Sequence, residues 1–135
     1  MANIELRLRW PPTINSYYQV VGRMRGIKRI SHAGLEFRKS VLDDMYEQLG
    51  SALFLTQPLS LTCIFYAPDR RIRDLDNYIK PLQDALTHAK LWEDDSIIDQ
   101  LHVYRGVVIP KGLVHLRLAD AGPVLPMDGM ALISQ

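Results

Sequence analysis

Two pairs of aspartates and a lysine stand close together in the middle of this sequence. Asp74 and Asp76 are two residues apart, Lys80 follows four residues after Asp76, and Asp94 and Asp95 form a second pair. On an extended chain, the first spacing points both side chains to the same side. Mg²⁺ binds one or two carboxylates together with waters or phosphate oxygens. The four aspartates are therefore candidate metal ligands, unless they are simply solvated loop residues.

Lys80 lies one helical turn after Asp76 if a helix begins near that aspartate. A lysine beside metal-bound carboxylates can stabilise negative charge in a transition state or protonate a leaving oxygen. The alternative is an ordinary helix ion pair with Asp76 or Asp84, worth about 0.3–0.5 kcal/mol. The second aspartate pair can join the first only if the segment after the helix returns along its flank. Four crowded carboxylates would then need cations, because like charges repel.

Cations lie close to the first aspartate pair and also accumulate near the N-terminus. Arg70, Arg71 and Arg73 stand directly before that pair, where they can offset its charge or meet a phosphate backbone. Residues 1–42 carry eight Lys and Arg against two Glu, a net charge of +6, whereas residues 43–135 carry a net charge of −5. This asymmetry favours a polyanionic partner, although a solvated basic face gives the same count.

Length and composition favour a single domain with one hydrophobic core. The chain has 135 residues, of which 47% are hydrophobic, and a domain of this size buries roughly two thirds of the surface that its unfolded chain exposes. Cys63 is the only cysteine, which excludes an intrachain disulfide and a cysteine-based zinc site and fits a reducing cytoplasm. No run approaches the roughly 20 apolar residues of a membrane span, and the N-terminus predicts no signal peptide. We therefore expect a cytoplasmic protein without a membrane partner.

Apolar periodicity predicts a strand, a loop and a helix in the first part of the chain. Ile4–Trp10 alternates apolar and charged residues, as a half-buried strand does, and two prolines end it. Residues 13–30 are expected to form a loop that closes with a short strand. Ser31 is a candidate N-cap for an amphipathic helix over Ala33–Leu49, which Gly50 ends. The residues expected on one face of this helix are Leu35, Val41, Leu42, Met45 and Leu49.

The middle of the chain predicts a second strand and a second helix. Leu59–Tyr66 is rich in β-branched, aromatic and apolar residues and is expected to be a strand. Asp76 or Asn77 can cap a helix that runs to about Lys90. Pro81 must then lie in or near the first turn, because an interior proline would cost about 3 kcal/mol.

The last part of the chain predicts two strands and a tail. Asp99–Ile109 and Leu113–Leu118 are expected to form a hairpin around residues 110–112. We therefore expect one α+β domain over residues 1–118, with two layers: a mixed β-sheet and helices on one face, in the order β-α-β-α-β-β. Residues 119–135 show no periodicity and predict a loose tail.

Three stretches of the sequence resemble one family. They are WPPTINSYY near the start, RISHAGLEFRKSV at the first helix, and APDRRIRDLDNYIKPLQDALTHAKLWEDDSIID in the middle. Together they are similar to the RusA-type Holliday junction resolvases of bacteria and their phages, over about residues 4–118. The middle block is the most specific, because Asp-Leu-Asp-Asn, a lysine, Asp-Ala-Leu and a tryptophan with an acidic pair follow in the family's order and spacing.

The resemblance implies a homodimeric, Mg²⁺-dependent endodeoxyribonuclease, with Mn²⁺ as a substitute ion, that resolves four-way DNA junctions in DNA recombination and repair. It implies no small-molecule cofactor and a place in the cytoplasm of a bacterial or phage-infected cell. Asn77 and Asp84 also match family positions and are expected to act locally, as a helix cap and an ion-pair partner. The implied catalytic residues are Asp74, Asp76, Lys80 and Asp95. The implied metal ligands are Asp74, Asp76, Asp94 and Asp95. The candidate DNA-binding residues are Asn15, Arg23, Arg25, Lys28, Arg29, Arg70, Arg71 and Arg73.

Two other functions stay open. A catalytically inactive protein could bind four-way junctions without cutting them. A small metal-binding or scaffold domain could carry the basic N-terminal part only as a solvated surface. Mg²⁺-dependent cleavage separates the first of these from a nuclease, and a salt titration of DNA binding separates the second from both.

Overall fold

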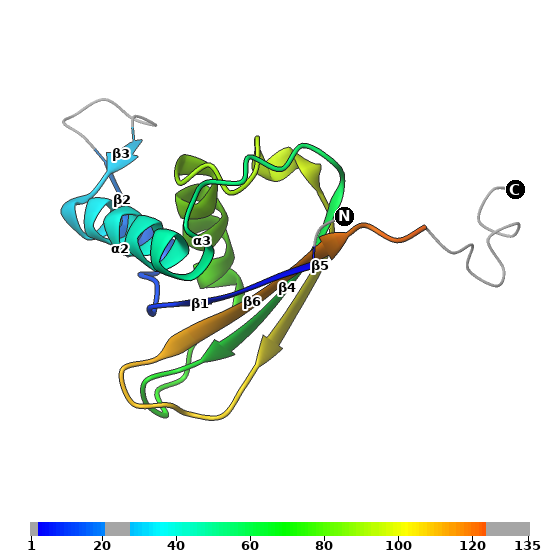
Figure 1. Cartoon of the computed structure of the whole chain (residues 1–135). Helices are drawn as coiled ribbons and strands as arrows, with labels where there is room; N and C mark the ends of the chain where they lie inside the picture. Colours follow the sequence, from blue (N-terminus) through cyan, green and yellow to red (C-terminus); the bar gives the residue numbers. More distant parts are fainter. Residues whose placement is uncertain (1–2, 21–27, 124–135) are drawn as a thin grey trace, which may run out of the picture.

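The computed structural model describes residues 3–20 and 28–123, and it shows one mixed four-stranded sheet with two long helices on one face (Figure 1). The strands of this sheet are β1 (Asn3–Leu8), β4 (Leu59–Tyr66), β5 (Ile98–Arg105) and β6 (Leu113–Asp120), in the order β1-β6-β4-β5. The two helices are α2 (His32–Leu49) and α3 (Asp76–His88). The smaller elements are α1 (Ile14–Tyr17), β2 (Tyr18–Val20), β3 (Lys28–Ile30) and the 3-10 helix η1 (Asp95–Ile97). The predicted α+β architecture is confirmed.

Strand β4 forms the centre of the core because its side chains alternate between the helices and the open face of the sheet. Leu59, Leu61, Cys63 and Phe65 are fully buried, and the residues between them are partly exposed. Each buried Leu or Phe stabilises the fold by about 1.5–3 kcal/mol relative to an exposed one. Burial also raises the pKa of the Cys63 thiol to about 12, so the cysteine is a core residue and not a nucleophile. This strand has the bounds that the sequence predicts.

The last two strands do not form the predicted hairpin. β5 pairs in parallel with β4, whereas β6 lies on the other side of β4 and pairs antiparallel with both β4 and β1. Residues 106–112 therefore cross the end of β4. A turn does form at Lys111 and Gly112, which both have positive φ values. A local turn signal, however, does not decide which strands pair. As a result, β4, α3 and β5 form a parallel β-α-β unit, and β5 is an edge strand.

The segment predicted as a loop over residues 13–30 contains a short helix and two strands. Thr13 caps α1, and its side-chain oxygen accepts a hydrogen bond from the Ser16 N–H at 3.3 Å. β2 and β3 form a separate antiparallel sheet that stands apart from the main sheet, at one end of α2 (Figure 1). The short strand expected at the end of the segment is confirmed as β3. Residues 21–27 lie outside the described residues.

Helix α2 begins and ends where the sequence predicts. The Ser31 side chain accepts a hydrogen bond from the Gly34 N–H at 3.0 Å. Gly50 closes the helix with a φ of +82°, a left-handed conformation that favours glycine. The caps therefore confirm the predicted helix to within one residue.

The buried face of α2 differs from the prediction. Val41 and Met45 are fully buried as expected, whereas Leu35 and Leu42 are 55% and 37% exposed. Phe37, which was not assigned to this face, is buried instead. Leu49 is partly buried against the core, so three of the five predicted residues face the core and two do not.

Helix α2 also covers the free edge of β1. Gln48 makes two hydrogen bonds with the Arg7 backbone, accepting from its N–H at 2.8 Å and donating to its carbonyl at 2.6 Å. Asp44 accepts from the Arg9 N–H at 3.1 Å and binds the Arg9 guanidinium at 3.0 Å. These contacts satisfy backbone groups that an edge strand leaves open.

Helix α3 starts without the cap that the sequence predicts. Asp76 is its first helical residue, and Leu75 occupies the N-cap position without a side-chain hydrogen bond. Pro81 lies in the second turn, just beyond its expected position, and it cannot donate a hydrogen bond to the Asn77 carbonyl. The helix ends at His88. Neither Asp76 nor Asn77 is therefore committed to capping, which leaves both side chains available for other contacts.

The ends of the described chain differ slightly from the prediction. β1 ends at Leu8, before Trp10, and β6 extends to Asp120, past the predicted boundary of the domain. Residues 124–135 lie outside the described residues, so the loose tail stays a prediction. In the described part of the chain, no helix combines the length and the apolarity that crossing a membrane requires.

Candidate active site at the start of helix α3

Asp74 and Asp76 lie on either side of the start of α3, and both are exposed. The Asp74 carbonyl accepts a hydrogen bond from the Asn77 N–H at 3.2 Å. Leu75, between them, has helical dihedral angles, with φ −61° and ψ −36°. The prediction that both side chains point to the same side of an extended chain is therefore wrong. The two carboxylates stand instead at a helix start, where unpaired N–H groups and the helix dipole favour negative charge.

The segment after α3 returns along the helix and brings Asp95 to Lys80. Trp92, in this segment, is fully buried in the core. The Asp95 Oδ2 atom lies 3.7 Å from the Lys80 Nζ atom. Among the described residues, Lys80 therefore forms its ion pair outside α3, and the alternative of an ordinary ion pair within the helix is wrong.

Asp94 holds the start of η1. Its side chain accepts a hydrogen bond from the Ser96 N–H at 3.1 Å, as an N-cap does. Hydrogen bonds from the Ser96 side chain and backbone, followed by the attraction of Lys80, lower the pKa of Asp94. Asp94 thus fixes the turn that presents Asp95.

The four aspartates do not close a metal site by themselves. Within the described ranges, no three His, Cys, Asp or Glu side chains are close enough to hold a metal ion. The chemistry of the donors nevertheless suits a divalent cation, because Asp74 and Asp76 are exposed carboxylates and Asp76 lies one helical turn from Lys80. Mg²⁺ commonly takes one or two carboxylates and completes its shell with waters or phosphate oxygens. These residues fit a metal site that the substrate completes.

Asp69 organises the arginine-rich loop before α3. Its carboxylate binds Arg73 at 2.8 Å and Arg71 at 3.0 Å. These hydrogen bonds, from Arg73 first, hold the pKa of Asp69 well below its ordinary value. The Arg73 side chain is only 13% exposed and lies 5.8 Å from the centre of the Trp10 ring, within the range of a cation–π contact. Arg105 of β5 fastens the loop by donating to the Arg73 carbonyl at 2.9 Å.

Arg70 differs from the other arginines of this loop. It is exposed, and in the part of the chain that the structure describes it forms no ion pair. Together with Arg71, Arg73, Arg105 and the carboxylate of Asp69 it lines a hollow of about 270 Å³. The hollow lies at the carboxyl ends of the parallel strands β4 and β5, which is where open α/β sheets bind ligands. Guanidinium groups around such a hollow suit a phosphate group.

The other candidate DNA-binding residues lie on the small elements near the N-terminus. Asn15 is exposed on α1, and Lys28 and Arg29 are exposed on β3. Arg23 and Arg25 lie outside the described residues. The basic strand β3 and the arginine hollow therefore belong to separate elements, one beside α2 and one beside the start of α3.

A partly buried network that the sequence did not predict joins α1, α2 and α3. Arg38 donates from Nη2 to the Asp84 Oδ2 atom at 2.7 Å and from Nε to the Tyr17 hydroxyl at 2.8 Å. The Tyr17 hydroxyl donates to the same Asp84 oxygen. Asp84 is thus an ion-pair partner, as expected, but of Arg38 rather than of Lys80. One signal was available, since all three residues fall inside the stretches that carry the family resemblance.

The pKa values of Tyr17 and Asp84 show how the residues of this network depend on one another. Burial raises the pKa of the Tyr17 hydroxyl, and the hydrogen bond to Asp84 raises it further. Burial alone would raise the pKa of Asp84, but the hydrogen bonds from Tyr17 and Arg38 outweigh it and lower the pKa. The carboxylate therefore stays ionised because its two partners are fixed beside it.

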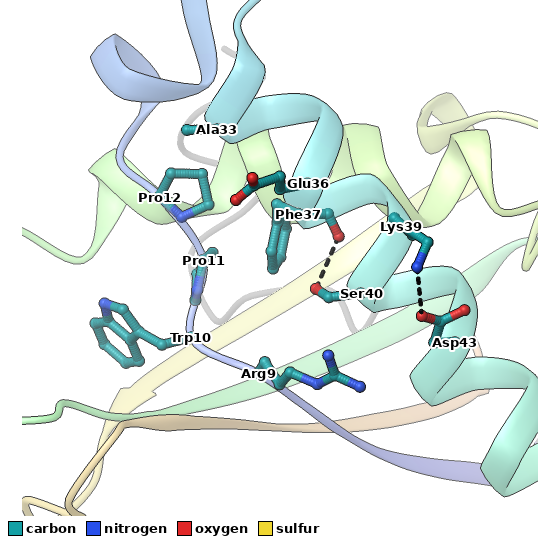
Figure 2. Close-up of a pocket in the computed structure, with 10 residues that line it drawn as sticks. All are labelled: Arg9, Trp10, Pro11, Pro12, Ala33, Glu36, Phe37, Lys39, Ser40 and Asp43. Atoms are coloured by element: carbon teal, nitrogen blue, oxygen red, sulfur yellow. Dashed lines mark hydrogen bonds and ion pairs between the residues drawn. The ribbon is translucent and has the colours of Figure 1, made fainter.

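A larger hollow, of about 660 Å³, opens between α2 and the segment that follows β1 (Figure 2). Its charged lining residues already have partners: the Lys39 Nζ atom lies 3.8 Å from Asp43, and Arg9 binds Asp44. None of the predicted site residues lines it. The chemistry therefore points to the start of α3 and not to this hollow.

Comparison with known proteins connects these residues to one group. Residues 11–115 match the family model described as Endodeoxyribonuclease RusA. A protein of Enterobacteria phage HK97 named crossover junction endodeoxyribonuclease rusA is 36% identical over 121 residues, which are 89% of this chain and 97% of that protein. Proteins named crossover junction endodeoxyribonuclease RusA from Shigella sonnei and Escherichia coli K12 are 33% and 32% identical over 125 residues, which are 90% of this chain and 98% of each protein. The matched region includes every candidate site residue.

Proposed function

We propose that this chain, which belongs to the endodeoxyribonuclease RusA family, resolves four-way DNA junctions by metal-dependent hydrolysis of phosphodiester bonds. The observation that carries the proposal is the ion pair between Lys80 and Asp95. It brings Asp95, from the second aspartate pair, to the helix that begins at the first pair. The name of the relatives, crossover junction endodeoxyribonuclease, supports the same substrate. The setting that we infer is DNA recombination and repair in the cytoplasm of a bacterial or phage-infected cell.

We assign a divalent cation, Mg²⁺ with Mn²⁺ as a substitute, to Asp74, Asp76 and Asp95, with Asp94 beside them. Such a cation, when bound, activates a water and stabilises charge on the leaving oxygen. Asp74 and Asp76 are exposed and form no ion pair within the described ranges, so they can accept a cation without losing another partner. Asp95 must share its carboxylate with Lys80, which lies 3.7 Å away.

Lys80 is the protein cation that we assign to the reacting phosphate. Its side chain is 51% exposed, so the ammonium can reach a phosphate group that approaches from solvent. There it stabilises the charge that grows on the phosphate oxygens or gives a proton to the leaving oxygen. Proton transfer by a positioned side chain typically contributes 10²–10⁴-fold to a rate.

The DNA backbone is assigned to two basic surfaces. Arg70 faces solvent at the arginine hollow, and Lys28 and Arg29 face solvent on β3. Arg71 and Arg73 already bind Asp69, so their part in DNA binding is mainly electrostatic. The remaining residues of the proposed DNA surface are Asn15, Arg23 and Arg25.

A homodimer is the assembly that we assign, because a junction has two equivalent strands to cut and one chain carries one cluster of site residues. The two edges of the main sheet support a position for the second copy. α2 covers β1, whereas the edge strand β5 leaves Leu101 and Tyr104 44% and 56% exposed. An edge strand with exposed apolar side chains can pair with another strand. Pairing between two copies of β5 about a two-fold axis would satisfy the open backbone groups of this edge and bring these side chains beside the second copy.

Cleavage of a synthetic mobile four-way junction tests the proposed function, with linear duplex of the same sequence as the control. We expect paired cuts in the junction only when Mg²⁺ or Mn²⁺ is present, and no cuts in the duplex. Tight junction binding without cleavage in either metal would identify an inactive junction-binding protein. DNA binding that does not depend on salt would contradict the proposed basic surfaces.

A further inference from the structure

Tyr17, Arg38 and Asp84 form a closed triangle of hydrogen bonds in which each member contacts the other two. Tyr17 is fully buried, and the side chains of Arg38 and Asp84 are 20% and 24% exposed. The Arg38 guanidinium also lies 5.8 Å from the centre of the Tyr17 ring. The three residues come from α1, α2 and α3, so the triangle fixes how these helices meet.

Stability alone is a weak reason for such a triangle. Taking an ionised carboxylate and a guanidinium even partly out of water is costly, and well-packed apolar residues often stabilise a fold as well or better. A buried charged network does, however, define one arrangement of its elements, because any other arrangement leaves a charge without a partner.

Through Tyr17, the triangle holds the base of β2 and β3. The Tyr17 carbonyl accepts hydrogen bonds from the Ser31 N–H at 2.9 Å and from the Ser31 hydroxyl at 3.0 Å. Gly34 lies so close that a Cβ atom on it would clash with the Tyr17 carbonyl oxygen. Tyr17 is therefore locked to the start of α2, and strand β2 begins at the next residue.

Through Asp84, the triangle reaches Lys80. The two residues are one helical turn apart on α3, and the charge of Lys80 is among the influences that lower the pKa of Asp84. Lys80 thus has one carboxylate on its own helix, Asp84, and another on η1, Asp95. The charge of Asp84 therefore acts on the same ammonium that lies 3.7 Å from Asp95.

We propose that Tyr17, Arg38 and Asp84 are positioning residues, which set Lys80 and the basic strand β3 in one fixed relation. DNA held on β3 would then present its phosphate to Lys80 in a single orientation. This inference rests on the proposed function, since it assigns Lys80 to the reacting phosphate.

Tyr17→Phe is the sharpest test, because it removes one hydroxyl and keeps the buried ring. We expect the single-turnover rate of junction cleavage to fall roughly tenfold, since small misplacements of reacting groups carry large rate penalties. Junction affinity should stay within about twofold, because no phosphate contact is lost. Tyr46→Phe is the matched control, as Tyr46 is an exposed tyrosine of α2. In a Lys80→Ala background, Tyr17→Phe should cause no further loss of rate, because the triangle acts through Lys80.

A second readout needs neither metal nor DNA. The NMR resonance of the Lys80 Cε methylene, assigned by its loss in Lys80→Arg, should shift in Tyr17→Phe and in Asp84→Asn but not in Tyr46→Phe. An unmoved Lys80 resonance, or an equal loss of rate with and without Lys80, would overturn the inference. If the unmodified protein cuts no junction, the proposed function fails, while the resonance still decides whether the triangle positions Lys80. Circular dichroism at the assay temperature establishes that both variants are folded.

Discussion

Asp76 and Asp84 lie two turns apart on the same helix, yet their surroundings are opposite. Asp84 is 24% exposed and binds Tyr17 and Arg38 with fixed geometry. Asp76 is exposed and has no ion pair among the residues that the structure describes. A carboxylate that holds structure must have its partners in place, because an unpaired buried charge is costly. A carboxylate without such partners, as Asp76 is, can bind a metal without any partner being displaced.

The arginines of the loop before α3 divide in the same way. Arg73 binds Asp69 and lies over Trp10, with a side chain that is only 13% exposed. Arg70, three residues earlier, is exposed at the rim of the arginine hollow. The mixture of charges in this stretch of sequence therefore combines two kinds of residue: those that build the loop and those that face a ligand.

The largest expected effect is the loss of cleavage when an exposed carboxylate becomes an amide. Asp74→Asn and Asp76→Asn should each reduce the cleavage rate to less than a few per cent, because a neutral amide is a poor ligand for a divalent cation. Junction binding should persist or tighten, since negative charge facing the phosphates is removed. Gel assays of cutting and binding measure both, with Asp43→Asn on α2 as the control. Substantial cutting by both variants would remove the metal assignment.

A smaller loss is expected when the cation beside these carboxylates is removed. Lys80→Ala should lower the cleavage rate by roughly 10²-fold, because a positioned acid or cation is lost. Lys39→Ala is a close control: Lys39 Nζ lies 3.8 Å from Asp43, much as Lys80 Nζ lies 3.7 Å from Asp95. Affinity should change little in either variant. A parallel fall of rate and affinity in Lys80→Ala would make Lys80 a phosphate anchor instead.

Local features of the fold were predictable from the sequence. The bounds of β4 follow from its apolar and β-branched composition, and the ends of α2 follow from Ser31 and Gly50. The pairing of β5 with β4 was not predictable, since it joins residues on either side of α3. A turn between β5 and β6 satisfies local rules equally well whether or not these strands are neighbours.

In the candidate site, too, local features were predictable from the sequence and contacts between distant residues were not. Asp74, Asp76 and Lys80 fall within seven consecutive residues, so their spacing alone raises the question of chemistry. The hydrogen bond between Arg38 and Asp84 spans 46 positions, and no periodic pattern records such a partner. The role of Asp69 was overlooked for a different reason. It stands close to Asp74 and Asp76, to which the sequence assigns a metal.

Substitution of Arg70 and of Arg73 by alanine is expected to have different effects. Arg70→Ala should weaken binding to all junction sequences alike and flatten the dependence of affinity on salt by about one unit, with no change in Tm. Arg73→Ala should lower Tm by a few degrees, because Asp69 loses its main partner and Trp10 loses a cation–π contact. Salt titrations and thermal melts separate the two. If Arg70→Ala lowers Tm while Arg73→Ala flattens the salt dependence, the division between the two arginines is wrong.

The smallest expected effect concerns the pH dependence of stability. The pKa of Asp84 in the folded protein lies below its ordinary value of 3.8, so the unfolded chain takes up a proton first as the pH falls. The stability that Asp84 contributes is therefore complete well above pH 3.8 and is lost as the pH falls from there through the folded pKa. Asp84→Asn should flatten this part of the profile of unfolding free energy against pH. The change is modest, because Asp69 and Asp94 also have lowered pKa values and keep their share of the slope. Denaturant titrations at several pH values between about 5 and 2 measure it, with Asp43→Asn as the control for the loss of one carboxylate. An unchanged slope in Asp84→Asn would mean that Tyr17 and Arg38 do not hold Asp84 in its ionised form.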